Sequence, residues 1–157
     1  MFEKSRTNSS DKDFIYLTKL LDKELWKQYG NEQAKYDKHN FLLNDEKAIV
    51  IYDNDTPIGC GAFRELSDKN SVEIKRMFVR KKYRGKGLGK LLLNEIESWA
   101  KELGFQSAIL ETGFKQTEAV LLYEKLGYTK IPNYPPYENM RESICMKKIF
   151  QQSGNFS

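Results

Sequence analysis

The sequence predicts a mixed α/β fold, with a mostly antiparallel central sheet that carries helices on both faces. Two observations support this prediction. Short apolar runs separated by turn residues follow one another between residues 48 and 79, as in a meander of strands. Beyond residue 79, strand-like runs alternate with segments of helical periodicity that end at glycines. A chain of 157 residues can bury one sizeable core. We therefore expect a single domain over residues 1–150, followed by a frayed tail at 151–157.

The first half of the chain is expected to start with a helix. The Ser10-Asp11 pair can cap a helix that runs to about Tyr29, because leucines recur there at helical spacing and Gly30 follows. A second short helix is expected over residues 33–38. The expected strands lie at 48–52, 58–66 and 71–79, with a turn at 53–57.

The second half is expected to alternate helices with strands. A helix opens after a cluster of glycines and carries Leu88, Leu92 and Ile96 on one face until Gly104 ends it. The remaining expected elements are a strand at 107–112, a helix at 117–126 and strands at 128–131 and 143–149.

Composition narrows the class of protein. Hydrophobic residues make up 39% of the chain, and no apolar run approaches the roughly 20 residues that a membrane span requires. The first residues lack the apolar centre of a signal peptide, so we expect a cytoplasmic protein with no membrane partner. Cys60 and Cys145 stand in apolar runs without C-x-x-C spacing and are expected to be buried free thiols. With His39 as the only histidine, we expect no metal site.

Positive charge is concentrated before and within the glycine cluster. The net charge is +4, and eight Lys or Arg residues fall between Lys75 and Lys90. Nucleic-acid-binding proteins also carry such patches, but here no aromatic residues are interleaved for base stacking. A small polyphosphate ligand explains the cluster more economically than a nucleic acid.

The glycine cluster itself indicates a phosphate site. Gly85, Gly87 and Gly89 lie between the end of an expected strand and the start of an expected helix. Glycines let the backbone approach a ligand, and the first turn of a helix presents N–H groups without intrahelical partners together with partial positive charge. Such a helix start binds anions, and a diphosphate fits it well.

Three familiar glycine-rich patterns do not match. A phosphate loop of the Walker type needs Ser or Thr where Leu91 stands, and the dinucleotide fingerprint needs Gly where Lys90 stands. The glycine loop of protein kinases fails on the same spacing. What remains is Arg84-x-x-Gly87-x-Gly89, which resembles the pyrophosphate-binding motif of the GNAT superfamily of acyl-CoA-dependent N-acyltransferases.

The resemblance implies that this segment wraps the diphosphate of coenzyme A. The residues it assigns to that role are Arg84, Gly85, Lys86, Gly87, Leu88, Gly89 and Lys90. It further implies that backbone amides of Met77, Phe78 and Val79 hold the acetyl carbonyl and the pantetheine arm.

A second segment, residues 119–128, resembles the family helix A-x-x-L-Y-E-K-x-G-F/Y. The resemblance implies that Tyr123 contacts coenzyme A and protonates the departing thiolate, a role that suits a phenol with a pKa near 10. The alternative is an aromatic side chain that packs the helix on the sheet. The family often has Asn where Gln116 stands, and the resemblance implies a contact of this residue with the pantetheine arm. The side chain of Gln116 keeps the amide but is one methylene longer than that of Asn.

The acceptor side of the reaction is assigned more loosely. Some family members carry a glutamate at the position of Glu73, and that glutamate deprotonates the amine. The alternatives for Glu73 are a surface carboxylate without a role in the reaction, or a charge that only orients the substrate. Glu111 is the competing carboxylate. Loop 131–138 is rich in proline and holds Tyr134 and Tyr137, which we expect to contact the substrate unless their rings only pack on the domain. A bacterial subgroup of the family has a similar I-P-x-Y-x-x-Y segment.

These observations predict an acetyl-CoA-dependent N-acetyltransferase that acts by direct attack in a ternary complex. The expected acceptor is a small-molecule or amino-acid-like amine, and a homodimer is left open. The alternative is a non-catalytic acyl-CoA-binding or nucleic-acid-binding module that uses the same basic loop. A covalent route through either cysteine is less attractive, because no histidine stands near either in sequence.

Overall fold

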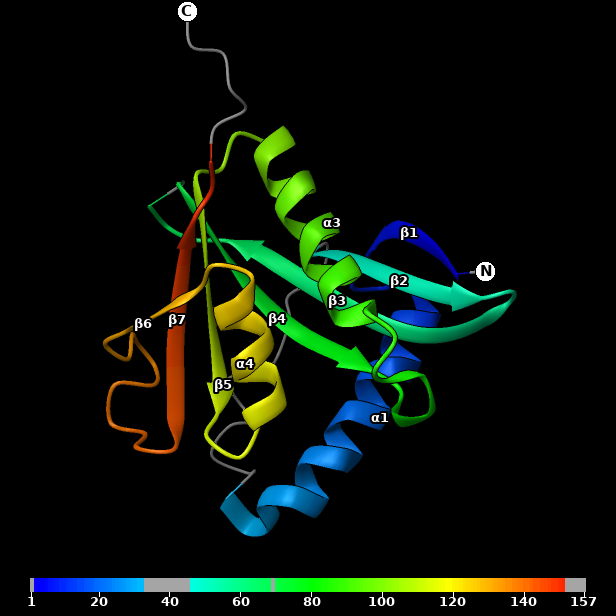
Figure 1. Ribbon diagram of the computed structural model, residues 1–157, viewed down its shortest axis with the longest axis horizontal. Helices are drawn as coiled ribbons and strands as arrows, with labels where there is room; N and C mark the ends of the chain where they lie inside the picture. Colours follow the sequence, from blue (N-terminus) through cyan, green and yellow to red (C-terminus); the bar gives the residue numbers. More distant parts are fainter. Residues whose placement is uncertain (1, 33–45, 69, 152–157) are drawn as a thin grey trace, which may run out of the picture. The chain divides into compact units, whose positions relative to one another are not determined.

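The computed structural model describes residues 2–32, 46–68 and 70–151 (Figure 1). Its contacts divide the chain into two compact units. The first comprises Met1–Arg64 and Lys75–Ile96, and the second comprises Glu65–Ile74 and Glu97–Ser157. The expected helix at 33–38 and the expected tail beyond residue 151 lie outside the described residues.

Seven strands occur within the described ranges, and hydrogen bonds order them as β1-β2-β3-β4-β5-β7-β6. Their bounds are β1 Phe2–Asn8, β2 Lys47–Asp53, β3 Thr56–Glu65, β4 Ser71–Val79, β5 Ser107–Gly113, β6 Thr129–Ile131 and β7 Ser143–Ile149. The helices are α1 Lys12–Tyr29, α3 Leu88–Glu102 and α4 Thr117–Lys125. The β4–β5 pair is parallel, whereas β1–β2, β2–β3, β5–β7 and β6–β7 are antiparallel. The predicted mixed, mostly antiparallel fold is confirmed.

In the first unit, α1 forms as its sequence predicts. The carboxylate of Asp11 accepts hydrogen bonds from the backbone N–H groups of Asp13 and Phe14, at 2.8 and 3.1 Å, and caps the helix start. Gly30 ends the helix with φ of 59°. The buried core of this unit consists of Phe14, Leu17, Ala48, Val50, Cys60, Ala62 and Phe78.

Strand β1 is not predicted by the sequence, which places no element before the first helix. Its residues, FEKSRTN, are mostly exposed and polar, because β1 stands at the edge of the sheet and pairs only with β2. Lys4 and Arg6 fasten it to Glu95 on α3, with N–O distances of 2.8 and 2.6 Å. Backbone hydrogen bonds to β2 and ion pairs to α3 therefore hold β1 in the fold. Neither kind of contact produces a hydrophobic pattern in the sequence, so β1 could not be predicted.

In the second unit, β5 is the central strand. Ser71–Ile74 of β4 pairs with Ser107–Leu110 on one side, and β7 pairs along the whole of β5 on the other (Figure 1). Tyr128 is buried in this unit, and its hydroxyl donates to Glu97 at 2.9 Å. Leu103 lies beyond the end of α3 and is 46% exposed.

None of the helices within the described ranges is both long and apolar enough to cross a bilayer. In the same ranges, no group of three or more His, Cys, Asp or Glu side chains is arranged to hold a metal ion. His39 lies outside those ranges.

Candidate functional site

The glycine loop of the first unit connects the end of β4 to the start of α3 (Figure 1). Gly85 and Gly87 have φ of +79° and +80°, a region that L side chains rarely adopt. A Cβ placed at either position would meet nothing within 4 Å. The glycines are thus required by the backbone conformation, and the space in front of that backbone is open to a ligand.

Helix α3 begins directly after these glycines, so its first turn lies beside the open space in front of them. The carbonyl of Gly87 accepts from the N–H of Leu91 at 3.1 Å, so the N–H groups of Leu88, Gly89 and Lys90 belong to the first turn. Such groups have no intrahelical acceptor, and the helix dipole adds partial positive charge. The side chains of Lys86 and Lys90 are exposed beside them. The arrangement can bind an anion with more than one phosphate group.

Arg84 ties this loop to its surroundings. Its Nε donates to the carbonyl of Val79 at 2.8 Å, and its Nη2 contacts Glu24 of α1 at 2.7 Å. The guanidinium also lies 5.7 Å from the centre of the Phe78 ring. The ion pair with Glu24 is exposed and contributes little, so a phosphate can compete for the same guanidinium.

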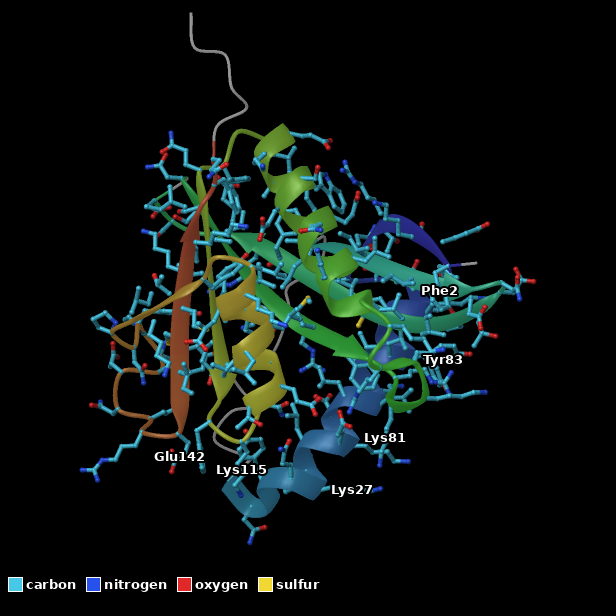
Figure 2. The ribbon with its side chains drawn as sticks, in the orientation of Figure 1. Phe2, Lys27, Lys81, Tyr83, Lys115 and Glu142 are labelled. Carbon is cyan, nitrogen blue, oxygen red and sulfur yellow. The ribbon has the colours of Figure 1, made fainter. Side chains whose placement is uncertain are left out.

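The turn before the loop is anchored by aromatic contacts. Figure 2 shows Phe2 of β1 next to Tyr83, with ring centroids 6.3 Å apart in a T-shaped arrangement. The hydroxyl of Tyr83 donates to Asp53 at 3.1 Å. The short helical turn Lys81–Tyr83 is therefore held to the sheet directly before the glycines.

The backbone of β4 departs from an extended strand at Arg76, which has φ of 60°. A residue with a Cβ holds this conformation only when its surroundings enforce it. Here the guanidinium of Arg76, with 8% of the side chain exposed, donates to the carbonyl of Thr18 at 3.1 Å and to Asp22 at 2.8 Å. Arg76, held by these two hydrogen bonds, lies directly before Met77–Val79, whose backbone the family resemblance assigns to acetyl and pantetheine binding.

In the second unit, Glu73 is buried. Only 2% of the residue is exposed, and Tyr134 donates a hydrogen bond from its hydroxyl to Oε2 of Glu73 at 2.9 Å. The alternative of a surface carboxylate is therefore wrong. A carboxylate in this position can accept a proton or orient a cation.

The strand register places further functional side chains with Glu73. Glu73 is opposite Ile109 in the parallel ladder, and Glu111 is opposite Cys145 in the antiparallel one. Because alternate residues of a strand share a face, Glu73, Glu111 and Cys145 lie on one face of the sheet. Ser143 lies on that face too, and its hydroxyl donates to Oε2 of Glu111 at 2.7 Å.

Tyr123 is 7% exposed on α4, and its ring centroid lies 5.9 Å from that of Tyr128. Burial raises the pKa of Tyr123 well above the ordinary value, and the negative charge of Glu111 raises it further. The phenol is therefore protonated throughout the neutral range and can act as a proton or hydrogen-bond donor. Gln116 precedes α4, and its side chain makes no capping hydrogen bond to the helix.

The proline-rich loop is internally hydrogen-bonded. The side-chain amide of Asn133 donates to three carbonyls of the loop, those of Tyr137, Met140 and Ser143, at 3.0–3.2 Å. Tyr137 is 1% exposed, and its ring makes a T-shaped contact with Tyr134 at a centroid distance of 5.6 Å. The loop therefore holds Tyr134 in a fixed place above Glu73.

Both cysteines are buried free thiols, as predicted. Burial raises the pKa of Cys60 to about 12, against a smaller opposing effect of the Arg76 charge. Burial also raises the pKa of Cys145 to about 11; a hydrogen bond from the Tyr134 backbone opposes this, whereas the charges of Glu111 and Glu73 add to it. Neither thiol is ionised at neutral pH, so neither is suited to attack a thioester.

Sequence reasoning missed three contacts that shape these sites. Tyr134 and Glu73 are 61 residues apart, and no local pattern signals their pairing. The hydrogen bonds of Arg76 to Thr18 and Asp22 have no signal in the sequence, because the positive φ that accompanies them occurs at a residue other than glycine. The pair between Glu24 and Arg84 joins segments 60 residues apart.

Comparison with known proteins identifies relatives along most of the chain. The family model described as the acetyltransferase (GNAT) family matches residues 14–128. An IAA acetyltransferase of Azospirillum brasilense is 32% identical over 135 residues, which cover 85% of this chain and 88% of that protein.

Solved structures give the same picture of the fold. A Klebsiella pneumoniae protein assigned as an acyl-CoA N-acyltransferase aligns with a TM-score of 0.77 and 28% identity, over 95% of this chain and 97% of that one. The PaiA N-acetyltransferase of Thermoplasma acidophilum, solved in complex with coenzyme A, aligns with a TM-score of 0.69 and 18% identity, over 96% and 99% of the two chains.

Proposed function

Because the chain belongs to the GNAT family of acetyltransferases, we propose that it transfers the acetyl group of acetyl-CoA to a primary amine. The observation that carries the proposal is the glycine loop, whose positive φ angles at Gly85 and Gly87 leave open space in front of backbone amides at the start of α3. Residues 84–90 would hold the diphosphate. Met77, Phe78 and Val79 would hold the acetyl carbonyl and the pantetheine arm through their backbones, with Gln116 as a further contact.

In this proposal Glu73 is the base. An ammonium group has no lone pair, so the acceptor must lose a proton before it can attack. The carboxylate of Glu73 takes that proton, and the neutral amine then forms the new C–N bond at the activated thioester carbonyl. Glu73 is buried and hydrogen-bonded, which fixes its position for such a transfer.

Tyr123 completes the reaction. As the C–S bond breaks, negative charge builds on sulfur, and the Tyr123 hydroxyl donates its proton there. The second proton of the amine leaves the amide nitrogen through water and restores the phenol, so that the products are the amide and the thiol. Tyr123 is protonated across the neutral range and is therefore available as the donor when charge develops on the sulfur.

The acceptor is proposed to be a small or amino-acid-like amine. Glu111 and Tyr134 would contact it, with Tyr137 behind Tyr134. The two carboxylates on one sheet face favour a cationic acceptor over an anionic one. We further propose that residues 1–150 act as one catalytic domain in the cytoplasm; the family match covers parts of both units.

The experiment is thioester turnover with a panel of primary amines, diamines and amino acids. Thiol release that depends on the amine, together with an acetylated product identified by mass spectrometry, is the expected result. Binding of coenzyme A without turnover of any amine would instead favour a non-catalytic acyl-CoA-binding module. A gel-mobility shift of labelled RNA or DNA, without any binding of coenzyme A, would favour the nucleic-acid alternative.

A further inference from the structure

The hydrogen bond between Tyr134 and Glu73 joins the proline-rich loop to the proposed base. Burial raises the pKa of Tyr134 far above its ordinary value, and the charge of Glu73 and their hydrogen bond add to this effect. Tyr134 is therefore protonated at every pH where the enzyme can be assayed. The phenol is the donor of this hydrogen bond, and Oε2 of Glu73 is the acceptor.

A hydrogen bond of this kind fixes the position of the carboxylate. A hydroxyl that donates to one carboxylate oxygen restricts the rotamer of the glutamate, because that oxygen is held. This restriction matters for a base, which must be correctly placed when the ammonium arrives.

A second carboxylate lies near Glu73. Glu73 of β4 and Glu111 of β5 are both within electrostatic reach of Cys145 on β7, so two carboxylates share this part of the sheet face. Each carboxylate has its own hydroxyl donor, Tyr134 for Glu73 and Ser143 for Glu111.

The loop is built to hold Tyr134 in place. Its carbonyl accepts from the N–H of Tyr137 at 2.7 Å, its own N–H donates to the sulfur of Cys145, and its ring packs against Tyr137. Asn133 bridges three further carbonyls of the same loop. Contacts of the backbone and of the ring thus support the side chain whose hydroxyl donates to Glu73.

We propose that Tyr134 is a positioning residue for the base: its hydroxyl holds the Glu73 carboxylate in one orientation, and the loop around residues 131–143 is the support that holds this hydroxyl in place. The inference rests on the proposed function, specifically on Glu73 as the base. It extends the expected substrate contact of Tyr134 by assigning its hydroxyl to the enzyme's own carboxylate.

The test is a double-mutant cycle of Tyr134→Phe and Glu73→Gln, with kcat and KM measured separately for the best amine. Tyr134→Phe keeps the ring and its packing but removes the donor. We expect kcat to fall about tenfold with little change in the KM for the amine, because the base is less well placed while the substrate still binds. In the Glu73→Gln background, the same substitution should change little, because its target is gone.

A matched control is Tyr52→Phe, which removes a tyrosine–carboxylate hydrogen bond of 2.6 Å to Asp13 in the first unit. Its kcat and KM should not change. Additive effects of Tyr134→Phe and Glu73→Gln, or a raised KM for the amine with an unchanged kcat, would overturn the positioning role while leaving the acetyltransferase function intact. Absence of turnover in the wild-type protein, or a Glu73→Gln variant with the wild-type kcat and KM, would instead contradict the proposed function.

Discussion

Arg84 donates a hydrogen bond from Nε to the carbonyl oxygen of Val79, at 2.8 Å. This bond ties the glycine loop back to the end of the strand that precedes it. The backbone assigned to the acetyl group and the loop assigned to the diphosphate are thereby joined by one side chain. The first prediction tests whether this joined segment is the site for coenzyme A.

Gly87→Val is expected to weaken coenzyme A binding by more than tenfold. The new side chain is strained at a φ of +80° and projects into the open space where the diphosphate would lie. The matched control is Gly104→Val at the opposite end of α3, because Gly104 has φ of +94° and a Cβ placed there would also meet nothing within 4 Å. Both variants should lose roughly 1–3 kcal/mol of stability. Calorimetry that finds equal affinity for coenzyme A in both variants would refute the site.

Tyr123→Phe is expected to lower kcat by about 10²–10⁴-fold, with a smaller change in the KM for acetyl-CoA. The substitution keeps the ring contact with Tyr128 and removes only the donor. Tyr128→Phe is the control, since it removes a buried hydroxyl that donates to Glu97 and should lower stability without lowering kcat. A Tyr123→Phe variant with the wild-type kcat would make Tyr123 a packing residue.

Glu95→Gln is expected to destabilise the protein in a pH-dependent way. Burial raises the pKa of Glu95, but hydrogen bonds and charges from Lys4 and Arg6 outweigh this and lower the pKa below its ordinary value. The stabilisation is therefore present above the unfolded-state pKa and is lost as the pH falls through the lower folded-state pKa. We expect a difference of roughly 0.5–1 kcal/mol at pH 7 that becomes smaller at an acid pH below the folded-state pKa. Urea unfolding at both pH values measures it, and an equal difference at both would contradict the ion-pair account.

The sequence predicted those elements whose periodicity and end signals are local. The first helix is an example, because Asp11, the spacing of Phe14 and Leu17, and Gly30 all lie within the segment itself. The glycine loop was predicted in the same way, since Gly85 and Gly87 are the residues that a positive φ requires. Strand β1 was missed because an exposed edge strand needs no apolar alternation.

The contacts that organise the second unit could not be predicted. Nothing near Tyr134 in the sequence indicates that its hydroxyl reaches Glu73, because the pairing depends on the sheet register and on the path of the loop. Arg76 is a comparable case in the first unit. Its conformation is enforced by Thr18 and Asp22, which are distant in sequence, so no local rule identifies it.

The central claim is that a buried carboxylate on β4 takes the proton of the acceptor amine, and the pH dependence of Glu73→Gln tests it most directly. Turnover of the variant and of the wild-type protein is measured with one amine from acid pH up to the pKa of that amine. The account predicts a defect that is largest at low pH and shrinks as the amine arrives deprotonated. A raised KM for the amine with little change in maximal rate would show a charge that only orients the substrate. Identical profiles for the two proteins would contradict both roles and leave Glu111 or a water chain as the base.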